Sequence, residues 1–301
     1  EASKEESLTE LDYMRKHGAF MIEPATYEKH KEEGWPTPSG KQEFYSQTMI
    51  DFGYPEHAIP HFRVKSQVHP SRLTGDDEYC LLPTFRLPQH IHSRSANAKW
   101  LVEIAHRNPI WIHPKDAAKL CIDEGDLLKI ETEIGWFVDK VWVTESIKPG
   151  VVGCSHHIGR WRRSQDQGNR FLTNEVKIDD QGDGKMRMRT VSGIQPFESE
   201  DPDTNRIWWR DGGVHQNITH AVQPDPISGA HCWLQKVRLS KPGPDEQYGD
   251  VEVDTEKSFA YYKKWNEMAL DKETHPRGER RPLWMKRPLS PRKEHWFMPS
   301  E

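Results

Sequence analysis

The sequence predicts a mainly β protein with short helices, built around a small closed barrel. Three observations predict it: several short apolar runs of strand length, one short helix, and tight glycine turns, all between residues 78 and 157. A parallel α/β sheet would instead alternate strands with longer helical patterns. Strands dominate this stretch and helices are short, so a barrel is the better prediction.

The first elements of the barrel are two apolar runs and the helix that follows them. EYCLLPTF (78–85) and NPIWIHP (108–114) have the length and composition of buried strands. PKDAAKLC (114–121) is then expected to form a short helix with Pro114 in its first turn. Proline suits that position because its missing N–H would have no partner within the helix.

The remaining elements are a hairpin and a return strand. DLLKIETEIGWFVDKVWVTE (126–145) alternates apolar and polar residues on both sides of a turn at Ile134 and Gly135, which is typical of a hairpin. HCWLQKVRLS (231–240) also alternates like a strand and has no other sheet to join. We therefore expect residues 78–157 and 214–240 to form one closed barrel.

The segments outside the barrel show weaker periodicity. LTELDYMRKHG (8–18) is a short helical piece with Thr9 as its cap and Gly18 as its stop, and Pro/Gly turns follow it. The end of the chain is rich in Pro, Lys, Glu and Trp without a hydrophobic period. The predicted segments are a lead-in from a preceding domain (1–75), a barrel domain (76–240) with a partly ordered insertion (158–213), and an extended carboxy-terminal arm (241–301).

Composition and charge exclude several classes of protein. The 301 residues contain no run of 18 apolar residues, so direct membrane insertion is not expected. The four cysteines lie far apart without C-x-x-C spacing, which argues against a zinc ribbon or an iron–sulfur cluster within this chain. The net charge is −5, and the one short arginine run (160–163) predicts salt bridges rather than nucleic-acid binding.

One basic stretch stands out in this acidic chain. TFRLPQHIHSRSANAKW (84–100) carries Arg86, His90, His92, Arg94 and Lys99 on the connection between the first two predicted strands. Guanidinium forks, imidazoles, hydroxyls and backbone N–H groups on such a loop can converge on one anionic group. The stretch therefore predicts a site for a phosphate or pyrophosphate at the barrel rim.

Five segments, in order, resemble the carboxy-terminal part of the molybdopterin oxidoreductases of the DMSO reductase family. They are PTPSGKQEFYS (36–46), FRLPQHIHSRS (85–95), NPIWIHPKDAAKLCIDEGDLLKIETEIG (108–135), IKPGVV (147–152) and NITHAVQPDPISG (217–229). The resemblance covers roughly residues 8–240 and implies a six-stranded double-psi β-barrel of the aspartate decarboxylase-like kind. It also implies that the barrel binds molybdopterin guanine dinucleotide, the bis-MGD cofactor of molybdenum or tungsten.

The resemblance also implies which residues contact the cofactor. Phe85 departs from the family, where a glycine frequently precedes the arginine. From the residues alone, a buried hydrogen-bonded pair or a surface turn is as compatible with His156 and the adjacent His157 as a functional role is, and Asn217 is also compatible with a turn cap. The implied contacts are Thr84, Arg86, His90, His92, Ser93, Arg94, Ser95, Asn108, Asp116, His156 and Asn217.

The family's enzymes transfer oxygen atoms or electrons, and their metal ligand and any iron–sulfur cluster belong to earlier domains. The resemblance therefore implies a carboxy-terminal fragment or the small half of a split catalytic subunit, inactive alone. The residue patterns of FRLPQHIHSRSANAKW and SHHIGRW are most similar to those of the family branch that acts on polysulfide, thiosulfate or sulfite.

Implied partners are the amino-terminal catalytic domains, an iron–sulfur electron-transfer subunit and a membrane anchor subunit. The expected location is a bacterial or archaeal membrane, reached through those partners. Two alternatives remain: a non-catalytic structural barrel subunit that lacks the pterin, and a barrel of the aspartate decarboxylase type acting alone. The second lacks a clear counterpart of the self-processing Gly-Ser pair.

Overall fold

The computed structural model contains two units, residues 1–61 and 62–301. Neither unit is described at every residue. The described residues are 8–19, 27–35, 37, 39–51, 54–61, 68, 72–83, 87–95, 98–166, 173–194, 211–222, 230–231 and 233–268.

The first unit consists of short helices. In α2 (Glu10–His17) the Thr9 hydroxyl accepts the backbone N–H of Asp12, and Gly18 ends the helix at φ +76°. The cap and stop predicted from the sequence are therefore confirmed. The other described helices of this unit are α3 (Lys29–Glu33), α4 (Gln47–Asp51) and the 3-10 helix η1 (Pro55–His57).

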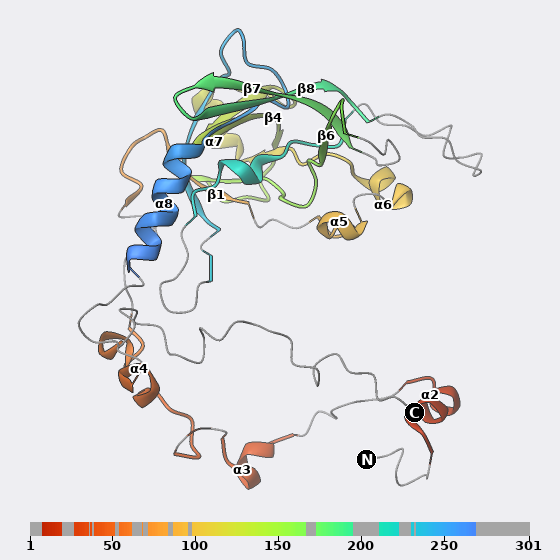
Figure 1. The fold of residues 1–301 in the computed structure, drawn as a ribbon, viewed down its shortest axis with the longest axis vertical. Helices are drawn as coiled ribbons and strands as arrows, with labels where there is room; N and C mark the ends of the chain where they lie inside the picture. Colours follow the sequence, from red (N-terminus) through yellow and green to blue (C-terminus); the bar gives the residue numbers. More distant parts are fainter. Residues whose placement is uncertain are drawn as a thin grey trace. The chain divides into compact units, whose positions relative to one another are not determined.

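The second unit contains the predicted barrel (Figure 1). Its six strands are β1 (Glu78–Leu82), β2 (Ile110–Ile112), β3 (Leu127–Glu131), β4 (Gly135–Val143), β5 (Val151–Gly153) and β9 (Gln235–Ser240). They pair in the order β2-β5-β1-β9-β3-β4, and β4 pairs back with β2, which closes the ring. The β1–β5 and β2–β4 pairs are parallel. The six-stranded barrel expected from the sequence is confirmed, including the return of β9 to β1 and β3.

The alternation of apolar residues along the strands fills the barrel interior. Leu81, Ile110, Leu128, Ile130 and Phe137 are fully buried in one core cluster. Each such side chain contributes about 1.5–3 kcal/mol relative to remaining exposed. Helix α7 (Pro114–Leu120) adds the buried Ala117 to this core, and its first turn holds the predicted proline.

Four further strands extend the sheet from one edge of β4. Residues 135–137 of β4 pair with β10 (Val251–Asp254), while residues 141–143 of the same strand pair with β2. β8 (Lys185–Ser192), β7 (Asn174–Gly182) and β6 (Trp161–Arg163) follow in that order. A Cβ on Gly135 would lie 2.1 Å from the Glu252 carbonyl oxygen, so the close approach of β4 and β10 requires glycine there.

One segment prediction is wrong where the structure describes it. Residues 241–268 are not an extended arm, because β10 lies between β4 and β8 and helix α8 (Thr255–Met268) follows it. The insertion contains a regular hairpin, β7–β8, which belongs to the barrel sheet. Strand β10 has only four residues, too few to show a period in the sequence. Residues 195–210 and 269–301 lie outside the described part of the chain.

No helix in the described ranges combines the length and the apolar character needed to cross a membrane.

Candidate functional site

The candidate site lies where the chain leaves β1 and β5. These strands run parallel and in register, Leu82 opposite Gly153, so their carboxyl ends reach the same rim of the barrel. Immediately beyond them, the Nδ1 atom of His156 lies 2.7 Å from the Pro83 carbonyl oxygen. This hydrogen bond joins the two loops that carry the predicted site.

Three imidazoles meet at this rim. The His92 ring centroid lies 4.7 Å from that of His156 and 4.8 Å from that of His157. The two adjacent rings of His156 and His157 are 4.5 Å apart. His92 is exposed at the start of the short helix α5 (His92–Ser95), whereas the other two are buried. We call these three residues the histidine triad.

The 3-10 helix η3 (Gln216–Thr219) lies against the exit of β5. The Gln216 side-chain amide donates to the Cys154 carbonyl at 2.8 Å, and the Asn217 amide donates to the His156 carbonyl at 3.5 Å. The remaining side-chain oxygens, Gln216 Oε1 and Asn217 Oδ1, are buried and have no hydrogen-bond partner among the described residues. Two buried amide acceptors are thus left for an external donor beside the triad.

More histidines and a tryptophan surround the triad. The Trp233 ring stacks on His156 at 5.7 Å and contacts His231 at 4.9 Å. Burial, followed by the neighbouring His231 and His156, lowers the pKa of His220 to about 3, so this imidazole is neutral. The rim is therefore a histidine-rich environment assembled from segments up to 140 residues apart.

The other members of the predicted basic loop lie differently. His90 is buried, and its Nε2 contacts the Ala105 carbonyl at the end of α6 (Lys99–Ile104), which anchors the loop. Arg94 is exposed on α5. Thr84 and Arg86 lie outside the described residues, and so do the side chains of Ser93 and Ser95. Five predicted residues on the rim loops and η3 thus have described side chains: His90, His92, Arg94, His156 and Asn217.

Asn108 and Asp116 are engaged in holding the fold together. The Asn108 amide donates to the carbonyls of Ser155 (2.7 Å) and Val214 (3.0 Å), and its oxygen accepts the Val214 N–H at 2.8 Å. Asp116 Oδ2 accepts the Gly150 N–H at 2.7 Å, which ties α7 to the turn before β5. All three hydrogen bonds of the Asn108 side chain go to backbone groups, so its geometry favours a structural role over a ligand contact.

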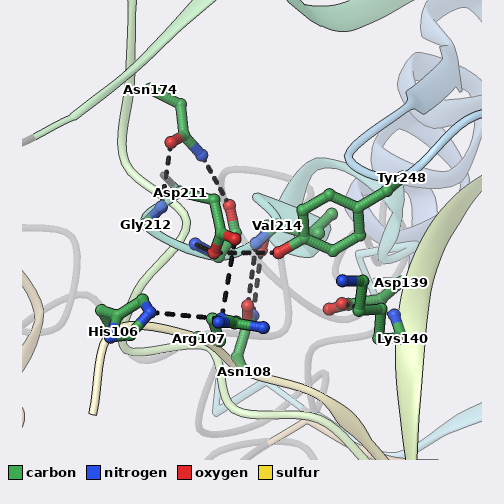
Figure 2. A network of polar contacts seen from close by, with 11 residues as sticks. His106, Arg107, Asn108, Asp139, Lys140, Asn174, Asp211, Gly212, Val214 and Tyr248 are labelled. Atoms are coloured by element: carbon green, nitrogen blue, oxygen red, sulfur yellow. Dashed lines mark hydrogen bonds and ion pairs between the residues drawn. The ribbon is translucent and has the colours of Figure 1, made fainter. Parts of the chain in front are cut away.

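Asn108 belongs to a larger polar network, shown in Figure 2. Asn174 accepts the Gly212 N–H and donates to the Gly213 carbonyl, both at 2.9 Å, so two asparagines hold the segment 212–214. Beside them the Tyr248 hydroxyl donates to Asp211 at 3.1 Å, and Arg107 lies 3.6 Å from the same carboxylate. Burial, then the nearby carboxylates, raises the pKa of Tyr248 far above its usual range.

Sequence analysis missed several residues of the rim. The predicted contacts did not include Gln216, His220, His231 or Trp233. For His157, a functional role was left open beside a structural one. The clustering of histidines in HHIGR, VHQNITH and AHCW was the signal available. It becomes informative only when the barrel brings these segments together.

The donor set at the rim fits a pterin dinucleotide. An exposed guanidinium and an exposed imidazole can donate to phosphate oxygens. The buried acceptors Gln216 Oε1 and Asn217 Oδ1 can take N–H groups of a heteroaromatic ring. The Trp233 indole, partly exposed beside His156, offers an aromatic face. Fold and site together define a barrel domain that can hold an anionic, ring-bearing ligand at its rim.

A comparison with known families finds a match within the barrel unit. Residues 81–191 match the family model described as "Molydopterin dinucleotide binding domain", a range that begins within β1, ends within β8 and includes α5 and the triad. Residues 81–191 are thus similar to a molybdopterin dinucleotide-binding domain, in agreement with the resemblance of the sequence to the DMSO reductase family.

Individual relatives agree with this assignment. The chain is 32% identical over 129 residues to a dopamine dehydroxylase of Eggerthella lenta, covering 41% of this chain and 12% of the relative. It is 33% identical over 133 residues to the trimethylamine-N-oxide reductase of Haemophilus influenzae, covering 42% and 15%. It is 26% identical over 215 residues to the molybdopterin-containing subunit of the Chrysiogenes arsenatis arsenate respiratory reductase, covering 62% and 24%.

Among solved structures, the chain is similar to acetylene hydratase from Pelobacter acetylenicus. The TM-score is 0.39 and the identity 23%, covering 50% of this chain and 20% of that one. The chain thus spans between about an eighth and a quarter of the length of these four relatives.

Proposed function

We propose that this chain is the cofactor-binding carboxy-terminal part of a molybdenum or tungsten oxidoreductase, and that its rim binds molybdopterin guanine dinucleotide in the bis-MGD form. One observation carries the proposal. The predicted basic loop, the exit of β5 and Asn217 meet at one rim, and residues 81–191 match a dinucleotide-binding domain model. Segments separated by more than 60 residues in sequence meet there around unused buried acceptors.

Each rim group has a distinct task in this proposal. Arg94, and Arg86 by its place in the sequence, would pair with the pyrophosphate through charge-assisted hydrogen bonds. Gln216 and Asn217 would accept N–H groups of the pterin and so orient its plane. The buried His90 would hold the loop in place through Ala105. The bound cofactor supplies the oxygen-atom or electron transfer, while these residues set its position.

We extend the proposal to the whole enzyme. Its substrate would be a small inorganic oxyanion or sulfur compound, as the resemblance of residues 85–100 to the polysulfide, thiosulfate and sulfite branch suggests. Electrons would be exchanged through an iron–sulfur subunit, and a membrane anchor subunit would place the complex at a bacterial or archaeal membrane. The remaining catalytic domains, with the metal ligand, would belong to the same enzyme.

The test uses the cofactor-loaded enzyme and two variants, Arg86→Ala and Asn217→Ala. Loss of a charge-assisted contact weakens binding by about 1.5–3 kcal/mol, and we expect reduced guanine nucleotide and metal per protein after dialysis. Arg163→Ala is the matched control, because Arg163 is an exposed arginine on β6 that pairs with Asp166. Full occupancy in both test variants would contradict the proposed site. A wild-type protein with neither guanine nucleotide nor metal would instead support the non-catalytic barrel subunit.

A further inference from the structure

We propose that the histidine triad, His92, His156 and His157, binds a divalent transition-metal ion of its own, separate from the metal of the pterin cofactor. One ring nitrogen from each of the three residues lies within 4.8 Å of the others. Imidazole is the ligand that zinc, copper, nickel and iron share, and no carboxylate belongs to this group of described residues. An all-imidazole set disfavours magnesium and calcium, which prefer oxygen ligands.

The hydrogen bonding of His156 prepares it as a ligand. With the Pro83 carbonyl 2.7 Å from Nδ1, that nitrogen must carry the proton and donate it. Nε2 is then the unprotonated nitrogen of the neutral ring, the form in which imidazole coordinates a metal. A metal-binding histidine typically donates its other N–H to a carbonyl or carboxylate in this way.

The backbone positions suit a site that closes around an ion. His156 and His157 are buried and fixed by their neighbours, including the His157 N–H donated to the Ser155 hydroxyl at 3.3 Å. His92 is exposed on a four-residue helix and has φ +43°, an uncommon conformation for a residue other than glycine. Strained backbone of this kind clusters at ligand sites.

The distances require only a modest movement. Zinc–nitrogen bonds of about 2.0–2.1 Å in a tetrahedron place ligand nitrogens about 3.4 Å apart. The triad nitrogens lie within 4.8 Å of one another, so movements of roughly an ångström bring them to that spacing. Three protein ligands leave a fourth position for water or an incoming anion.

An aromatic ring packs against the triad. The indole of Trp233, stacked on His156 at 5.7 Å, limits the mobility of that ring.

This inference goes beyond the proposed function and changes the role of two residues. His92 and His156 were expected to contact the dinucleotide, whereas the triad geometry assigns their ring nitrogens to the second metal. The two proposals fail separately, because the dinucleotide test uses Arg86 and Asn217 while the metal test needs no pterin.

The experiment measures binding of zinc and cobalt to the full 301-residue chain, purified free of metal. We expect one zinc per chain by titration against a chromophoric chelator, and a visible tetrahedral spectrum with cobalt. His92→Asn is the main variant, because asparagine tolerates the positive φ and His92 is exposed, so the fold is preserved. This variant should bind zinc at least about tenfold more weakly and lose the cobalt spectrum.

His17→Asn is the matched control, since His17 is an exposed histidine of the other unit, at the end of α2. His157→Gln supplies a second variant from the buried pair, with its circular dichroism spectrum compared with that of the unchanged chain. Stoichiometric zinc binding that His92→Asn leaves unchanged would overturn the assignment, as would the absence of zinc binding by the folded chain. Equal losses in His92→Asn and His17→Asn would show nonspecific binding and also overturn it.

Discussion

Replacing Asn108 with alanine should destabilise the barrel unit, and the size of the effect follows from its three hydrogen bonds. The side chain is buried and bonds the Ser155 carbonyl, the Val214 carbonyl and the Val214 N–H at 2.7, 3.0 and 2.8 Å. A buried polar group left without its partner costs about 1–3 kcal/mol. The Val214 N–H has no second acceptor in this network, and the two carbonyls lose a donor each. We expect a total loss of about 3–4 kcal/mol.

The assay is urea unfolding followed by tryptophan fluorescence, with the midpoint and the slope fitted separately. Gln181→Ala is the control, because Gln181 is exposed on β7 and a surface substitution changes stability by roughly 0.5 kcal/mol or less. A midpoint for Asn108→Ala equal to that of the control would refute the reasoning. If the same variant kept its stability but lost the dinucleotide in the loaded enzyme, Asn108 would be a ligand, as the sequence first indicated.

Three further predictions concern buried groups. Gly159→Ala should lower stability by about 3 kcal/mol in the same assay, because φ is +91° and a Cβ would lie 2.2 Å from the Val214 carbonyl oxygen; an unchanged midpoint would contradict this. Burial raises the pKa of Asp139 well above its usual value, so stability should fall as pH rises from about 4 towards that raised pKa. Asp139→Asn should remove this dependence, so the stability of the variant relative to that of the unchanged protein should be higher at pH 8 than at pH 4. Parallel pH profiles of the two proteins would contradict this. Arg187→Met should lower stability by about 3–5 kcal/mol, because the buried Asp250 carboxylate would lose the guanidinium that lies 2.6 Å from it. The double variant, which adds Asp250→Leu, should recover most of this stability.

The barrel was predictable because its signals are local. Alternation over residues 126–145, the proline at the start of α7 and the return strand near residue 235 each follow from periods of two or from turn chemistry. A closed barrel was expected because the return strand had no other sheet to join. In the structure the ring closes through β2 and β4. These rules need no knowledge of distant contacts.

Strand β10 was missed because its signals are not local. VEVD contains two apolar residues, and only Val251 is fully buried, opposite Phe137 and Met188 of the neighbouring strands. Its pairing with β4 depends on Gly135, more than a hundred residues earlier, which lets the two backbones approach. Four residues between turn-forming segments cannot reveal such a partner, and so the tail was interpreted as an arm.

The two asparagines of the predicted site show why the sequence could indicate its loops but not the task of each residue. Asn108 and Asn217 have the same side chain, and both stand in segments that resemble one family. Folding gives Asn108 three backbone partners, which satisfy its amide and leave little for a ligand. It gives Asn217 one weak donor contact, to the His156 carbonyl at 3.5 Å, and leaves its buried oxygen without a partner among the described residues. A buried acceptor without a partner costs free energy that the protein recovers only when something donates to it. The difference supports the proposal that Asn217 contacts the cofactor, whereas Asn108 holds the fold together, and it depends on contacts 61 and 106 residues away in the chain.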